Sequence, residues 1–123
     1  MELTNTNLRY LLTIYHLSRK RLEVSSKDVA AALEVSRASV TSMMSILVEK
    51  RLVEKERYGK IHLTAQGRRL AGGLADQADR LAAALRGWME LPGEEAWMAA
   101  CAAVSELSCR SAAPAARWEA LTA

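Results

Sequence analysis

Apolar side chains recur at helical spacing in the first fifty residues and predict three helices. The first helix is capped by Asn5 or Thr6 and ends near residues 18–21. A second, short helix follows a pair of serines, and Ser36 caps the third helix after a turn at residues 34–35. The apolar positions that define the three helices are Leu8, Leu11, Leu12 and Tyr15, then Val29, Ala30 and Leu33, then Val40, Met43, Met44 and Leu47.

After the third helix the pattern changes to two short extended runs, residues 52–56 and 61–63. They flank a polar stretch that contains Gly59, which predicts a β-hairpin with its turn at the glycine. Thr64 then caps a long fourth helix, and residues 91–93 break it. Its apolar stripe is predicted to be Leu70, Leu74, Leu81, Leu85 and Trp88.

A fifth helix follows the break. Glu94 and Glu95 suit its first turn, because acidic side chains complement the positive end of the helix dipole. Its apolar face is predicted to be Trp97, Cys101 and Val104, and it ends at residues 111–114. The fold class is therefore mainly α: a winged helix-turn-helix of three helices plus a two-stranded wing over residues 1–71, followed by a helical dimerisation domain over residues 72–123.

Charge is unevenly distributed along the chain. Thirteen of the seventeen Lys and Arg residues lie in residues 1–70, whereas the rest of the chain is net acidic. Taken alone, such an uneven charge distribution is also typical of a solvated surface that binds no partner. Together with the order of the elements, the basic excess in residues 1–70 favours a head that binds a polyanion.

Composition narrows the class of protein. The sequence has no run of eighteen apolar residues, and its first ten residues lack a basic-then-apolar leader, so we expect no membrane span and no membrane partner. Two cysteines are too few for a disulfide framework, which favours a reduced, cytoplasmic protein with Cys101 in the core and Cys109 at the surface. The sequence contains no nucleophile motif and no phosphate-binding loop, so we expect no enzyme.

In a winged helix-turn-helix the third helix lies in the major groove of DNA. The outward face of this third helix is small and mostly uncharged, which suits close approach to base edges, and only Arg37 offers a strong bidentate contact. DNA shape and the spacing of half-sites then supply much of the specificity. The alternative for the wing is an ordinary polar hairpin that contacts no DNA. The predicted DNA contacts are Ser26, Arg37, Ala38, Ser39, Thr41 and Ser42 from the helices, and Arg57, Tyr58 and Lys60 from the wing.

Four motifs lie in order over residues 9–74: YLLTIYHL, DVAAALEVSRASVTSM, LVE and LTAQGRRLA. Together they resemble the diphtheria-toxin-repressor and manganese-transport-regulator family of metal-dependent repressors. The resemblance continues more weakly over residues 79–82 and 94–106. It implies a homodimer, joined through its C-terminal helices, that binds a palindromic site on double-stranded DNA when manganese or iron is bound.

The resemblance also gives the positions of the family's metal ligands, and here the sequence departs from the pattern. Those positions hold Arg9, Leu12, Asp79 (Ala78 with a slip of one residue), Ala102, Ser105 and Glu106. Hard divalent ions need several oxygen, nitrogen or sulfur ligands, and a cation among them is unfavourable. We therefore expect no metal cofactor, unless a rearranged manganese or iron site uses Asp76, Asp79, Cys101, Glu106 or Cys109.

The leading interpretation is a cytoplasmic, dimeric repressor that has lost its metal dependence. A metal-responsive repressor with a rearranged site, and a winged-helix protein-interaction module without DNA binding, remain as alternatives. A sharper hypothesis concerns Arg9, which stands where a metal ligand belongs. Its guanidinium could replace the ion by pairing with Asp79 and Glu106, whereas the simpler alternative is that Arg9 points into water.

Overall fold

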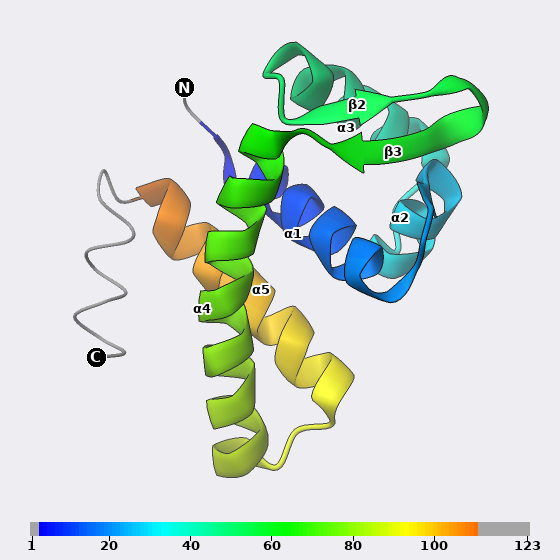
Figure 1. The fold of residues 1–123 in the computed structure, drawn as a ribbon. Coiled ribbons are helices and arrows are strands. Elements are labelled where there is room, and N and C mark those ends of the chain that lie inside the picture. The colour runs from blue at the N-terminus through cyan, green and yellow to red at the C-terminus, as the bar shows by residue number, and fades with distance from the viewer. Residues whose placement is uncertain (1–2, 111–123) are drawn as a thin grey trace.

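The computed structural model describes residues 3–110, and the predicted order of elements is confirmed (Figure 1). A winged helix-turn-helix head precedes a pair of long helices. The head contains a single turn of 3₁₀ helix (Arg57–Gly59) at the tip of the hairpin. The other elements are α1 (Asn5–Lys20), β1 (Val24–Ser25), α2 (Ser26–Leu33), α3 (Arg37–Glu49), β2 (Val53–Lys55), β3 (Lys60–Leu63), α4 (Ala65–Met89) and α5 (Gly93–Arg110).

The cap of α1 differs from the prediction. Thr4, rather than Asn5 or Thr6, is the N-cap, and its hydroxyl accepts a hydrogen bond from the backbone N–H of Asn7 at 3.1 Å. The Asn7 side chain accepts in return from the backbone N–H of Thr4 at 2.9 Å. This reciprocal capping box satisfies two helix-end donors at once. A cap at residue 5 or 6 would lie too close to Asn7 for the same pair of hydrogen bonds, which need a spacing of three residues.

The wing belongs to a three-stranded antiparallel sheet in the order β1-β3-β2, not to a two-stranded one. Val24 pairs with Ile61 and Val53 with Leu63. The sequence could not reveal β1, because two residues are too few to show an alternating pattern. The turn is at Gly59 as predicted, and Tyr58 beside it also adopts the left-handed conformation, with φ values of 81° and 69°.

Helix α1 lies at the centre of the molecule and contacts α2, α3, α4 and α5 (Figure 1). The predicted core of the head is confirmed at Val40, Met44 and Leu47, while Met43 is partly buried. Leu11 and Leu12 of α1 are completely buried, and so is Val29 of α2. One continuous core therefore joins the head to the helical pair.

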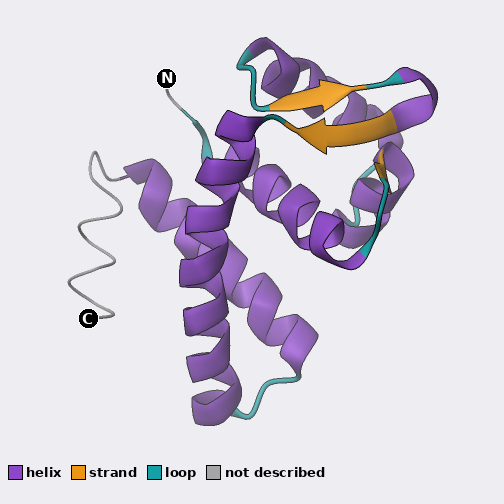
Figure 2. Cartoon of the chain, in the orientation of Figure 1, coloured by secondary structure: helices purple, strands orange, loops and turns teal. Residues whose placement is uncertain are grey.

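Helix α5 runs back beside α4 from the loop that joins them (Figure 2). The leucine stripe that the sequence predicted for α4 is confirmed in part, because Leu74 is buried. Trp88 is 80% exposed, and Leu70, Leu81 and Leu85 are only partly buried. Most of the buried face of α4 consists of short side chains, because these let neighbouring helices approach closely. These residues are Gly67, Ala71, Ala75, Ala78 and Ala82, with Leu74 beside them.

The remaining predictions about the helices have mixed outcomes. On α5, Trp97, Cys101 and Val104 are buried and Cys109 is exposed, all as predicted. The predicted boundary at residues 71 and 72 falls inside the continuous α4, and the predicted end of α5 at residues 111–114 lies outside the described residues. Within residues 3–110 no single helix is long and apolar enough to cross a membrane; α2 and α3, bent by 113°, pass that test only as a pair.

Gly67 gives a test of how α4 is seated on the head. A Cβ at this position would lie 2.0 Å from the backbone carbonyl oxygen of Leu52, so the backbone itself would have to move. We expect Gly67→Ala to lower the free energy of unfolding by about 3 kcal/mol, measured by urea denaturation. Gly73→Ala is the matched control, because nothing lies within 4 Å of its Cβ and a helical alanine contributes up to about 1 kcal/mol over glycine. Equal midpoints for the two variants would contradict this packing.

Candidate nucleic-acid interface

The outward face of α3 begins directly after a sharp turn. Glu34 ends α2 in the left-handed conformation, and Ser36 then caps α3 by accepting from the backbone N–H of Ser39 at 3.0 Å. The residues that the sequence assigned to DNA on this helix are all exposed. Arg37 makes no hydrogen bond or ion pair through its side chain within the described residues, so its guanidinium is available to a partner. The other exposed members are Ala38, Ser39, Thr41 and Ser42.

Two hydroxyls near this face donate their protons back to the helix. Thr41 Oγ1 donates to the carbonyl oxygen of Arg37 at 3.0 Å, and Ser45 Oγ donates to that of Thr41 at 3.2 Å. A hydroxyl that has donated its proton presents only lone pairs to an outside partner. These side chains therefore suit donor groups on base edges better than phosphate oxygens, and Arg37 is the strong donor of this face.

A hollow of about 700 Å³ lies between α3, the start of α2 and the wing. Lys27, Arg37 and Lys55 line it, and its one lining acid, Glu56, is within 3.2 Å of His62. Within the described residues none of the three cations forms an ion pair. The hollow is therefore a cationic recess next to the outward face of α3, suited to a phosphate backbone.

Ser26 lies in this hollow rather than on an open surface. It is only 8% exposed, and its hydroxyl has no hydrogen-bond partner within the described residues. Lys27 and Lys55 are lining residues that the sequence interpretation missed. Along β2 Val53 is buried and the two following residues are exposed, so the pattern of the strand gave no signal for Lys55.

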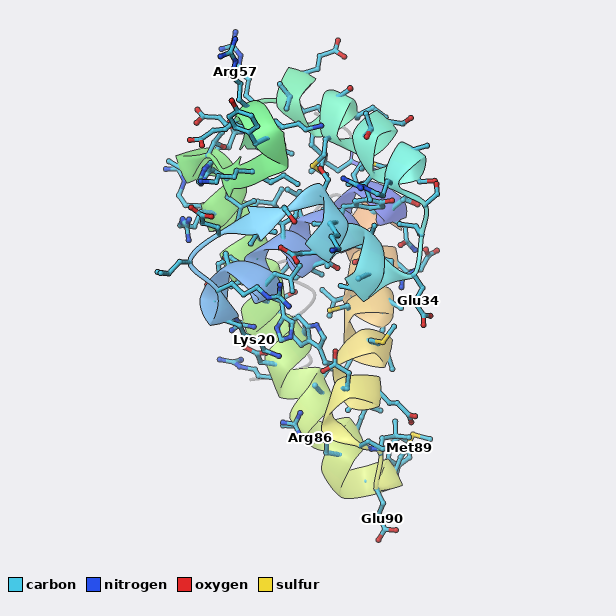
Figure 3. The ribbon with its side chains drawn as sticks, turned by 90° about the vertical axis from the view of Figure 1, so that its right-hand side faces the viewer. Lys20, Glu34, Arg57, Arg86, Met89 and Glu90 are labelled. Carbon is cyan, nitrogen blue, oxygen red and sulfur yellow. The ribbon has the colours of Figure 1, made fainter. Side chains whose placement is uncertain are left out.

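The wing supplies the most exposed of the predicted contacts. Arg57 extends clear of the ribbon at the top of Figure 3, and the side chain of Tyr58 is 94% exposed. Tyr58 also lines the cationic recess. Lys60 lies elsewhere, because its ammonium donates to a carboxylate oxygen of Glu23 at 2.8 Å. This hydrogen bond raises the pKa of Lys60, whose charge is already matched by Glu23.

The predicted contacts on α3 divide between two sides of the helix. Arg37 and Thr41 face the cationic recess, whereas Ala38, Ser39 and Ser42 line a second hollow of about 580 Å³ against α1. The walls of the second hollow include apolar side chains such as Val35 and Ile46. The structure therefore brings Ser26, Arg37, Thr41 and Tyr58 together in one recess and leaves the other contacts outside it.

Several positions of the inferred metal site hold packed, uncharged side chains. Leu12 on α1, Ala78 on α4 and Ser105 on α5 are completely buried, and Ala102 is partly buried. Within residues 3–110, no three His, Cys, Asp or Glu side chains gather closely enough to hold a metal ion. The Ser105 hydroxyl has no hydrogen-bond partner among the described residues, and one neutral oxygen cannot replace a ligand set. The residues present do not fit a divalent ion.

The hypothesis that Arg9 replaces the ion is wrong. Arg19, not Arg9, pairs with Asp79, at 3.2 Å, and Glu106 accepts a hydrogen bond from the side-chain amide of Asn5. No hydrogen bond or ion pair within residues 3–110 joins Arg9 to either carboxylate. The reason is the helical rise: Arg9 and Arg19 are about 15 Å apart along α1, and Asp79 lies level with the far end.

Helix α1 is nevertheless tied to both long helices at its two ends. Arg19 holds Asp79 of α4 and lies over the rings of Tyr15 and Trp97, at 5.1 and 5.7 Å from their centroids. Asn5 holds Glu106 of α5. These contacts join the same three helices that the resemblance expects a metal ion to join.

Comparison with known proteins gives the same architecture. The family described as iron dependent repressor, N-terminal DNA binding domain, matches residues 2–61. The manganese regulator SloR is a similar solved structure, with 24% identity, a TM-score of 0.69, and coverage of 94% of this chain and 52% of its own. IdeR from T. acidophilum is similar at 22% identity and a TM-score of 0.70, with coverage of 94% and 54%.

At these identities the two structures establish the fold alone. The chain spans about half the length of each. Among curated proteins, none matches the sequence.

Proposed function

Because the chain belongs to the iron-dependent repressor family, a family of DNA-binding regulators, we propose that it acts as a homodimeric repressor whose binding to DNA needs no metal ion. The observation that carries the proposal is the cationic recess between α3 and the wing. Phosphate groups give most of the affinity of such a surface, and side chains on α3 add the sequence preference. The family and the fold give no support to catalysis, so the proposed role is that of a regulator.

Each protomer contributes one head to the proposed complex. The first turn of α3 enters the major groove with Arg37 toward a base edge, and Lys27, Lys55 and Arg57 contact the backbone on either side. A two-fold protein presents two such heads, so the expected operator is palindromic. Cytoplasmic location follows from this role, because the DNA it regulates is there.

The DNA prediction is that affinity for duplex DNA falls steeply as salt rises, measured by fluorescence anisotropy. Lys55→Ala or Arg57→Ala should weaken binding to all sequences about tenfold and lower the salt slope by about one. Arg37→Ala should in addition relax the base preference at one position of each half-site. Arg86→Ala is the matched control, because Arg86 lies at the opposite end of the molecule (Figure 3).

An unchanged affinity for the wing variants would contradict the proposed surface. If duplex DNA is not bound even at low salt, the protein is a winged-helix interaction module and the repressor proposal fails. Equal losses for Arg86→Ala and Arg57→Ala would indicate that net charge, rather than the recess, determines binding.

Dimerisation is supported by apolar side chains that the single chain leaves at the surface. Trp88, Met89 and Met98 are 80%, 55% and 40% exposed, all on the helical pair. Exposed apolar side chains on an otherwise well-packed helix pair favour a protein contact. We propose that a second copy covers these side chains through residues 74–108.

Light scattering at micromolar concentration should then give twice the 13.5 kDa mass of the chain. Met98→Asp should give monomers, because the contact would have to bury a charge. Met98 is a cleaner site than Trp97, which is 8% exposed and stacks on His16 inside the chain. Leu22→Asp is the control, because Leu22 is fully exposed on the head, outside residues 74–108. A monomeric native chain would overturn this part of the proposal.

Metal independence is supported by the complete burial of Leu12 and Ser105 at positions where the family's ligands are expected. We expect a chelator such as EDTA to leave the affinity for DNA unchanged. Added Mn²⁺ or Fe²⁺ should change it no more than the same concentration of Mg²⁺, which controls for ionic strength. An increase of about tenfold or more with Mn²⁺ or Fe²⁺ alone, worth about 1.4 kcal/mol, would favour a rearranged metal site.

A further inference from the structure

A small crevice lies between α1, the end of α2 and the first half of α5, on the opposite side of the head from the wing. Its volume is about 90 Å³. Leu17, Leu33 and Trp97 form apolar parts of its lining, and Arg9, His16 and Lys20 form polar parts. Neither the proposed DNA interface nor the proposed dimer contact uses the three polar side chains, and Met98 at the edge of the lining is the side chain that the crevice shares with the proposed dimer contact.

His16 presents a hydrogen-bond donor that is not satisfied. Its Nδ1 lies 3.4 Å from Nη2 of Arg19, and a guanidinium can only donate, so Nδ1 accepts. In the neutral ring the proton is then on Nε2, which is buried and has no partner within the described residues. Burial, with further contributions from Lys20 and Arg19, lowers the pKa of His16, which keeps the ring neutral at pH 7.

The ring of His16 is also held in place. It stacks on Trp97 with centroids 4.4 Å apart and planes inclined by 22°. Because Trp97 is itself only 8% exposed, the stack gives the crevice a rigid wall. The ring therefore has a fixed position beside the crevice, with the buried Nε2 turned away from solvent.

Arg9 and Lys20 add two cations to the crevice. Neither side chain makes an ion pair or hydrogen bond within residues 3–110, and Glu94 is the one acid in the lining. Their backbones are about 16 Å apart along α1, so the two side chains reach the crevice from its opposite ends. The lining thus has a cation at each end, with apolar and aromatic surface between them.

We propose that this crevice binds a short aliphatic dicarboxylate. One carboxylate pairs with the planar guanidinium of Arg9, and the other pairs with Lys20. The methylene carbons of the ligand contact Leu17 and the Trp97 side of the His16–Trp97 stack. A water needs about 10–15 Å³ in this measure of volume, so the crevice holds about six to nine non-hydrogen atoms, and a four-carbon dicarboxylate has eight.

The test is a titration of the full chain with succinate at constant ionic strength, followed by the amide NMR signals of the lining residues. Shifts should concentrate at the end of α2 and the start of α5. Butyrate keeps one carboxylate, succinamide keeps none, and sulfate keeps the charge without the shape. We expect each of these three to bind about tenfold or more weakly than succinate.

The variants separate the two ends of the crevice. Arg9→Gln and Lys20→Gln should each lower the affinity for succinate about tenfold, to the level of butyrate, whereas Arg86→Gln should leave it unchanged. Binding of sulfate as strong as that of succinate, equal losses with Arg86→Gln, or no shifts at about 10 mM succinate would overturn the proposal. Because the titration contains no DNA, its outcome is independent of the proposed repressor function.

Discussion

The fold depends on α1 being buried on several sides at once. Leu11, Leu12 and Ile14 are at most 1% exposed, and the helix contacts every other helix of the described chain. Burying each of these side chains contributes about 1.5–3 kcal/mol. Because the same helix belongs to the core of the head and to the core of the helical pair, neither part can move without disturbing α1. The position of the head is therefore set by packing.

This packing explains how the arrangement can persist without an ion. Leu12 and Ser105 fill space between α1 and α5 where carboxylate or imidazole ligands would need room and charge. The Arg19–Asp79 pair joins α1 to α4, but its side chains are 38% and 48% exposed, so it contributes about 0–1 kcal/mol. The apolar contacts thus supply most of the stability, and the polar contacts at the two ends of α1 fix its orientation.

The sequence was informative where the physics is local. The caps at Ser36 and Thr64, the turn at Gly59 and the core positions of α3 each follow from nearby residues, and all are present. Contacts between distant residues were not accessible in this way. The sequence could not show that Asp79 pairs with Arg19 rather than Arg9, or that Lys60 pairs with Glu23, because both depend on how elements are placed in space. The leucine stripe of α4 was right at Leu74 and missed the buried alanines for a related reason: periodicity ranks side chains by apolarity, whereas close helix contacts select small ones.

The local chemistry of α3 limits how the proposed repressor can read DNA. Thr41 and Ser45 have already donated their hydroxyl protons within the helix, and Ala38 has only a methyl group to offer. Arg37 is thus the one side chain of the first turn that can make two strong hydrogen bonds to a guanine. One such contact per half-site gives about 1–3 kcal/mol of discrimination, which is far less than a specific operator requires. The remainder has to come from the width and deformability of the DNA under the wing, and from the fixed spacing of two heads. Rigid seating of the head on α1 is what makes that spacing a source of specificity.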